Sequence, residues 1–218
     1  MNSRSAVTRA LLLGLQLFLT AAALAFLPGA GNKLLAFLVV WLLSFRKLTT
    51  RELVAYAVVC ALFSVMDILA VRQGVLRFSF PDYAGLPVWE YFMWGFFVLH
   101  AIRMLGGPPP GGPSTTAIGL ALVFAAPFAS LSDPAMLLGA SGLALALALA
   151  AYHARWDLAY VGYMIAVGAI IEYTGVWSGA WSYPDAPPGG VPPWFVPMWG
   201  GVGLFTRRLI VPHIAAGR

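Results

Sequence analysis

The chain has 218 residues, of which 61% are hydrophobic and 10% are charged, and its formal net charge is +5. Soluble domains are usually about half apolar and about a quarter charged, so this composition excludes a soluble protein. Apolar runs near the length that spans a bilayer, about twenty residues, recur along the chain. The basic residues lie at the ends of these runs, so the positive charge indicates membrane topology and not a nucleic-acid partner.

Eight candidate spans follow one another along the chain. They cover approximately residues 8–27, 31–45, 53–71, 88–105, 115–131, 135–153, 158–177 and 193–211. The sequence therefore predicts an all-α, polytopic transmembrane bundle. The stretch AAALAFLPGAG after the first apolar core also has the small residues of a signal-peptide cleavage site. The repeat described next needs this first span, so we expect the mature protein to keep it.

One motif occurs twice in the chain. FSFPDYAGLPVWEYFMWGFFVL, residues 78–99, is closely similar to WSYPDAPPGGVPPWFVPMWGGVGL, residues 181–204, after a two-residue insertion. The matching positions include Trp and Met, which are rare residues. The segment 106–116, GGPPPGGPSTT, breaks helices and lies near the midpoint. We therefore predict a single membrane domain, 1–218, of two halves, about 7–105 and 115–212, joined by this loop. Four spans in each half make the halves parallel repeats about an axis along the membrane normal.

Basic residues are distributed unequally between the two sides of the membrane. Ten lie on one side, and only Lys33, Arg72 and Arg77 lie on the other. The positive-inside rule assigns the richer side to the cytoplasm. We therefore expect a protein of the cell (inner) membrane with both termini in the cytoplasm and both copies of the motif at the outer face. The ten are Arg4, Arg9, Arg46, Lys47, Arg51, Arg103, Arg155, Arg207, Arg208 and Arg218.

Three acidic residues lie near the outer ends of three spans. Asp67 precedes the end of the third span, Glu90 follows the start of the fourth, and Glu172 precedes the end of the seventh. From the helical rise, these carboxyls lie roughly 4–8 Å below the outer helix ends. Acids at that depth usually face the bundle interior and mark function, and removal from water favours a protonated, proton-donating carboxyl. The alternative is that each acid caps its helix or pairs with Arg72 or Arg77.

Aromatic side chains crowd the same layer. An interfacial aromatic belt accounts for some of them. Trp94 and Trp199 lie deeper, each beside a glycine that permits close packing. An aromatic wall beside a buried acid would stabilise a carbocation through its ring faces. The predicted substrate-binding residues are Trp89, Trp94, Trp181, Trp199, Phe80 and Tyr183.

Other chemistries lack their motifs. His100, His153 and His213 are isolated, without the spacing of a zinc site or of a diiron histidine box. The sequence also lacks the glycine-rich phosphate loop, the dinucleotide fingerprint and the nucleophile elbow. No metal or cofactor site is predicted, and we expect His100 to be packed within the fourth span.

Two segments resemble known families. The first segment, residues 67–97 (DILAVRQGVLRFSFPDYAGLPVWEYFMWGFF), resembles the integral-membrane lycopene cyclases of bacteria and fungi. Those cyclases have an acid, an aromatic pair, Gly-x-Pro and a further acid in this order. The matching residues here are Asp67, Phe78, Phe80, Gly85, Pro87 and Glu90. IEYTGVWSGAWSYPDAPPGGVP, residues 171–192, is similar to the related carotenoid hydratases at Glu172, Gly175, Gly179, Trp181 and Tyr183. Together the matches cover about a third of the chain.

This resemblance implies acid-initiated chemistry on a long polyene, without a redox cofactor. Glu90 or Glu172 would donate the proton, and Asp67 would assist as partner carboxylate or as proton acceptor. The partner would be a hydrophobic isoprenoid or carotenoid substrate within membrane lipid. The cyclases carry two adjacent acids where this chain has only Glu90, so cyclisation and hydration both stay open. The sequence does not predict an oligomeric state.

Two non-enzymatic interpretations also stay open. A repeat with acids at a common depth describes a multi-pass transporter as well, or a lipid-binding membrane protein without catalysis. A carrier needs a polar path towards the cytoplasm, and the first, second, fifth and sixth spans have no ionisable residue at their centres. That observation disfavours the carrier. A third interpretation is an assembly partner that has no pocket.

Overall fold

Helices dominate the computed structural model, which describes residues 3–45, 47–111, 115–186 and 190–216. The first four are α1 (Ser3–Phe26), α2 (Ala30–Ser44), α3 (Thr50–Arg72) and α4 (Glu90–Leu105). The next four are α5 (Thr115–Ser130), α6 (Pro134–Ala151), α7 (Arg155–Trp177) and α8 (Phe195–Phe205). The predicted all-α bundle of about eight spans, in two parallel four-helix repeats, is confirmed. Part of the linker 106–116, residues 112–114, lies outside the described residues.

The helices have the length and surface of membrane spans. α3, α6 and α7 are long and apolar enough to cross a bilayer, and α1, α2 and α5 contain shorter apolar segments. Large apolar side chains also cover the outer surface; on α1, Leu11 is 69% exposed and Phe18 is 67% exposed. Such a surface is unstable in water and suits lipid. The chain is therefore a multi-pass membrane protein.

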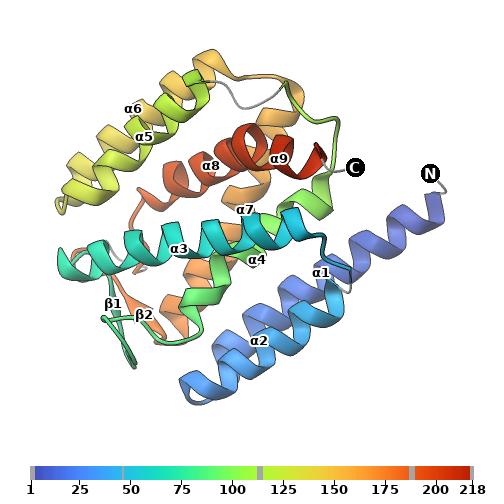
Figure 1. Cartoon of the computed structure of the whole chain (residues 1–218). Coiled ribbons are helices and arrows are strands. Elements are labelled where there is room, and N and C mark those ends of the chain that lie inside the picture. The colour runs from blue at the N-terminus through green and yellow to red at the C-terminus, as the bar shows by residue number, and fades with distance from the viewer. Residues whose placement is uncertain (1–2, 46, 112–114, 187–189, 217–218) are drawn as a thin grey trace.

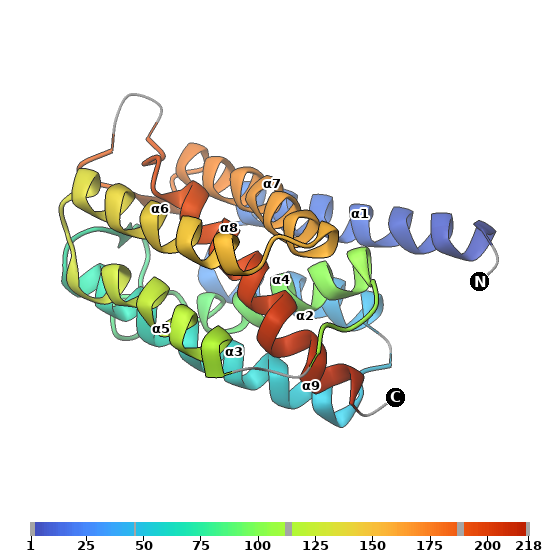
Figure 2. The same cartoon turned by 90° about the horizontal axis from the view of Figure 1, so that it is seen from above.

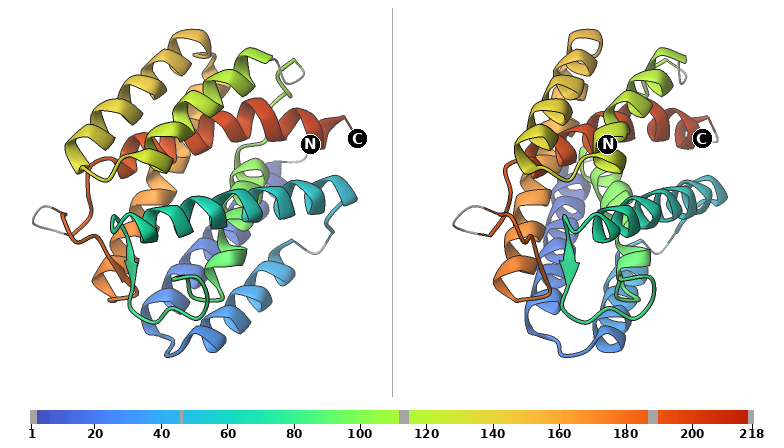
Figure 3. Two further views of the ribbon diagram at one scale, coloured as in Figure 1. Left: turned by 60° about the vertical axis from the view of Figure 1, so that its left-hand side comes forward. Right: turned by 90° about the vertical axis from the view of Figure 1, so that its left-hand side faces the viewer.

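Two helical hairpins enclose a central group of four helices. The α1–α2 and α5–α6 hairpins lie on opposite sides of α3, α4, α7 and α8 (Figure 1). The N-terminal end of α1 projects beyond the other helices when the molecule is seen from above (Figure 2). α8 runs between the α5–α6 hairpin and α3 (Figure 3). Each hairpin packs against the other half, because α1 contacts α7 and α5 contacts α3.

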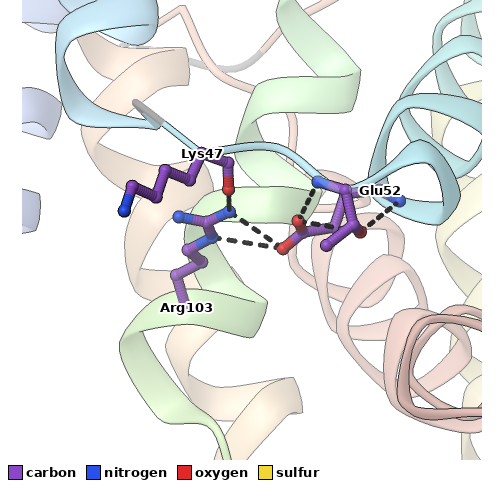
Figure 4. Close-up of polar contacts among 4 residues, drawn as sticks. Lys47, Glu52 and Arg103 are labelled. Atoms are coloured by element: carbon purple, nitrogen blue, oxygen red, sulfur yellow. Dashed lines mark hydrogen bonds and ion pairs between the residues drawn. The ribbon is translucent and has the colours of Figure 1, made fainter. Parts of the chain in front are cut away.

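An ion pair joins the N-terminal end of α3 to the C-terminal end of α4. Thr49 caps α3 in a capping box with Glu52, and the Glu52 carboxylate also accepts a hydrogen bond from Arg103 Nη2 at 3.0 Å. Arg103 donates to the Lys47 carbonyl as well (Figure 4). The Glu52 side chain is only 1% exposed, so this pair stabilises the helix crossing by satisfying a buried charge.

The same arrangement recurs in the second half. Asp157 and Arg208, each 105 residues after Glu52 and Arg103, form an ion pair between α7 and the turn that follows α8. Arg208 lies in a π-helical turn, η1 (Thr206–Ile210), through which α8 continues into α9 (Val211–Ala215). Arg103 and Arg208 therefore hold helix pairs together.

A short antiparallel bridge joins the two copies of the repeated motif. β1 (Arg77–Phe78) pairs with β2 (Trp181–Ser182), with Phe78 opposite Trp181. Ser79 adds a backbone bond to Ala180 at 3.1 Å. The bridge holds the loops that follow α3 and α7 against each other at one end of the bundle.

Candidate functional site: a carboxyl-lined cavity

A cavity of about 220 Å³ lies among α3, α4, α5 and α8. Most of its lining is aliphatic or aromatic, with side chains such as Phe63, Phe97, Phe124, Phe128 and Val202. Among the described residues, carboxyl groups enter it only near the C-terminal ends of α3 and α7 and at the N-terminal end of α4. The cavity therefore has a long apolar wall and one polar end.

Asp67 and Glu90 form one part of the polar end. The Trp94 indole donates a hydrogen bond from Nε1 to Asp67 Oδ2 at 2.9 Å, and Glu90 lines the same end of the cavity. Trp94 can reach Asp67 because Gly95, beside it, has no side chain where Tyr56 of α3 packs. The close approach of α3 and α4 thus brings the acids of two helices together.

Glu172 forms the other part and accepts three hydrogen bonds. Trp181 Nε1 and the Tyr183 hydroxyl donate to Oε2 at 3.2 and 2.6 Å, and Trp199 Nε1 donates to Oε1 at 3.0 Å. Glu172 is 4% exposed. Burial, together with the Glu172 charge, raises the pKa of the Tyr183 phenol well above its ordinary value, so that the hydroxyl keeps its proton and donates.

Glycines on α7 make room for these indole rings. A Cβ atom at Gly168 would overlap the ring of Trp199, and one at Gly175 would overlap the ring of Trp181. Both indoles therefore pack directly on the α7 backbone, on the helix that carries Glu172. Small residues in α7 are the local sequence feature that gives this carboxylate its donors.

The two polar groups are related by the repeat but are not identical. Asp67 and Glu172 lie 105 residues apart, as do Trp94 and Trp199, and the two indole rings stack with their centroids 4.8 Å apart. The counterpart of Glu90, at the same spacing, is Phe195. The cavity therefore receives two acids from the first half and one from the second.

Seven of the nine side chains predicted for the site line this cavity. They are Asp67, Glu90, Trp94, Glu172, Trp181, Tyr183 and Trp199. Trp89 is buried beside Phe37 and Phe78, outside the cavity lining. Phe80 is 78% exposed, because the loop turns its side chain outward. Within the described residues, Arg72 and Arg77 form no ion pair with these acids.

A second buried polar group was not predicted. His100 is 2% exposed; its Nδ1 lies 3.1 Å from Gln16 Oε1 and its Nε2 lies 2.6 Å from the Tyr163 hydroxyl. The group joins α1, α4 and α7. Gln16 and Thr20, one turn apart in an apolar span, were the sequence signal, because polar side chains on one face of a spanning helix usually have partners inside the bundle.

Comparison with known proteins gives a likeness in fold only. No family model and no curated protein matches the sequence. The crystal structure of MvINS, a mycobacterial Insig homologue from Mycobacterium vanbaalenii, is similar with a TM-score of 0.64 and 17% identity, over 77% of this chain and 97% of that one. A cross-linked MvINS trimer gives a TM-score of 0.67 and 17% identity, over 79% and 97% of the two chains.

These neighbours correct the predicted family. They are Insig homologues, so the resemblance to lycopene cyclases and carotenoid hydratases is wrong, as is the enzymatic function in carotenoid biosynthesis, cyclisation or hydration, inferred from it. Other residues of the repeated motif, and the matching residue Gly85, have structural roles. Asp82 accepts a hydrogen bond from the Val88 backbone at 2.8 Å. Gly85 and Gly190 adopt positive φ, at 87° and 77°, which only glycine adopts readily.

Proposed function

We propose that this chain is a non-catalytic membrane protein that binds a lipid in the cavity among α3, α4, α5 and α8. The observation that carries the proposal is the cavity itself: an apolar chamber inside the bundle with carboxyl groups at one end. Ligand sites typically combine an apolar lining with a few placed polar groups. The fold of an Insig homologue is compatible with a non-enzymatic membrane protein.

The polar end would hold the head of the lipid. Asp67, Glu90 and Glu172 supply hydrogen-bonding groups there, and the hydrocarbon part would lie against Phe97 and Phe124. Trp94, Trp181, Trp199 and Tyr183 would act as positioning residues, because each donates a hydrogen bond that fixes the orientation of a carboxyl group.

Lipid bound to the purified protein tests this proposal. Ala125 on α5 lines the cavity, whereas its neighbour Ala126 is exposed on the outside of the same helix. Ala125→Trp should fill the cavity, and Ala126→Trp serves as the matched control. We expect mass spectrometry to find one lipid species retained by the wild type and by Ala126→Trp but lost from Ala125→Trp. Equal lipid content in all three proteins would contradict the proposal.

We also propose an arrangement in the membrane and a repeat organisation. The excess of basic residues at one side supports the cell (inner) membrane with both termini in the cytoplasm, and the spacing of equivalent residues supports duplicated halves of about 7–105 and 115–212. A reporter fused after Arg218 tests the orientation. Green fluorescent protein should fluoresce there and alkaline phosphatase should be inactive; an active phosphatase would reverse the orientation.

A further inference from the structure

We infer that the occupant of the cavity is a lipophilic amine, with its ammonium group among the carboxyls of Asp67, Glu90 and Glu172 and its hydrocarbon body along the apolar wall. The inference rests on the proposed lipid-binding function and names the chemical class of the lipid. It depends on the charges that the cavity presents and on which partners those charges have.

Glu172 accepts hydrogen bonds at both carboxyl oxygens, and such donors stabilise the ionised form of a carboxyl group. Trp181 donates to one of its oxygens and Trp199 to the other. An indole N–H can only donate, so neither ring can accept a proton from the acid. Both oxygens therefore need lone pairs directed at their partners. The buried carboxylate is solvated by donors but has no countercharge among them.

Asp67 and Glu90 place two further carboxyl groups in the cavity. Asp67 accepts a hydrogen bond from Trp94 Nε1 at 2.9 Å, and such a donor stabilises the ionised form of a carboxyl group. This arrangement is not required by the fold, because Phe195 occupies the position equivalent to Glu90 in the other half. The fold thus accepts an apolar side chain at this position of the repeat. In the first half the position is occupied by Glu90, whose side chain is buried and only 8% exposed.

The cavity lining provides no countercharge. Among the described residues that line it, none is Lys, Arg or His. A buried charge without a partner costs several kcal/mol, on the order of the penalty for breaking a buried ion pair. The described residues also include no group of three His, Cys, Asp or Glu side chains placed to hold a metal ion. An ammonium group has three N–H donors and can bridge carboxyls that are too far apart for one metal ion.

The body of the ligand follows from the rest of the wall. Beyond the carboxyls the lining is hydrocarbon, from Leu62 and Met66 on α3 to Leu209 and Ile210 near the inner end of the eighth span. An alkyl chain buried there gains about 0.8 kcal/mol per CH₂. A lipid alcohol would gain the same burial but bring no charge, and a fatty acid would bring a charge of the wrong sign.

Three ligands with the same tail test the inference: oleylamine, oleyl alcohol and oleate. Their binding to purified protein is measured at pH 7 with radiolabelled ligand, and binding that persists in Ala125→Trp is subtracted as partitioning into detergent. We expect oleylamine to bind roughly tenfold or more tightly than oleyl alcohol, with oleate weakest. Glu90→Gln and Glu172→Gln should remove most of the preference for the amine over the alcohol. Asp185→Asn, in an exposed loop, should change neither.

The possible outcomes separate the two proposals. Equal or tighter binding of oleyl alcohol than of oleylamine in the wild type would overturn the amine inference and leave lipid binding intact. An amine preference that survives both glutamine variants would also overturn it. If none of the three ligands binds the wild type better than Ala125→Trp, while both proteins are monodisperse with similar Tm, the amine inference and the proposed function both fail.

Discussion

At the scale of single residues, one difference between the two halves is a hydroxyl group. Tyr183 donates to Glu172 at 2.6 Å, whereas Phe80, its counterpart in the repeat, is turned outward and exposed. The extra hydroxyl supplies a third donor to one carboxylate. Within the described part of the chain, Asp67 has no such hydroxyl donor, and Glu90 lines the cavity beside it.

Tyr183→Phe measures what that hydroxyl contributes. The variant keeps the ring and removes one hydrogen bond to a charged group, so we expect a loss of about 1.5–3 kcal/mol in unfolding free energy. The readout is a lower Tm of the purified protein in detergent. Tyr173→Phe on α7 is the matched control, because Tyr173 is 51% exposed and its variant should keep the wild-type Tm. Similar Tm values for both variants would show that the bond contributes nothing.

The sequence predicts some of these residues better than others. The common depth of Asp67, Glu90 and Glu172 follows from helix rise, which is the same in every sequence. The donors to each carboxyl depend on how closely the helices cross, and a single chain does not reveal that distance. Phe80 was expected in the wall, but side-chain direction in a loop has no period that a sequence could show.

At the scale of elements, α7 and α8 pack closely against each other. A Cβ atom at Gly203 would clash with the backbone carbonyl of Tyr160, which cannot move away as a flexible side chain can. Helices that approach this closely need glycine at the contact. The position of α8 against α7 therefore depends on this residue, and with it the reach of Trp199 to Glu172.

Gly203→Ala should force the two helices apart. Overpacking of this kind costs about 1–3 kcal/mol, which corresponds to a fall in Tm of roughly 2–12 °C. Gly162→Ala is the control on α7, because nothing lies within 4 Å of its added methyl group; alanine there should preserve or raise Tm through its better helix propensity. Destabilisation by both substitutions alike would point to a general intolerance of alanine and not to the helix contact.

Hydropathy predicts the helices well and their internal irregularities poorly. The eight spans are predictable because each must carry an uninterrupted apolar run. The π-helical turn at Thr206–Ile210 is not predictable from hydropathy. An added residue in a helix turn shifts the side chains that follow around the helix axis, but it does not change how apolar the segment is. The family prediction failed for a related reason: turn and glycine positions recur wherever a chain reverses between helices, whatever the protein does.

At the scale of the whole molecule, neither half is complete alone. α1 packs on α7 and α5 packs on α3, so each half covers a surface of the other. We expect fragments 1–111 and 112–218, when expressed together, to copurify as a folded complex, and either alone to aggregate or be degraded. Size-exclusion chromatography after pull-down on one tagged fragment is the measurement. A single fragment that is monodisperse and thermally stable would contradict the expectation.

The stacked pair Trp94 and Trp199 has a consequence for how such a protein diversifies. Residues in equivalent positions that touch one another lie on a local twofold axis, as Phe78 and Trp181 also do. A homodimer built about that axis must change both faces whenever it changes one. A single chain that carries both copies is free of this constraint. It has glutamate at position 90 and phenylalanine at the equivalent position 195, so its cavity is asymmetric in a way that a symmetric homodimer could not be.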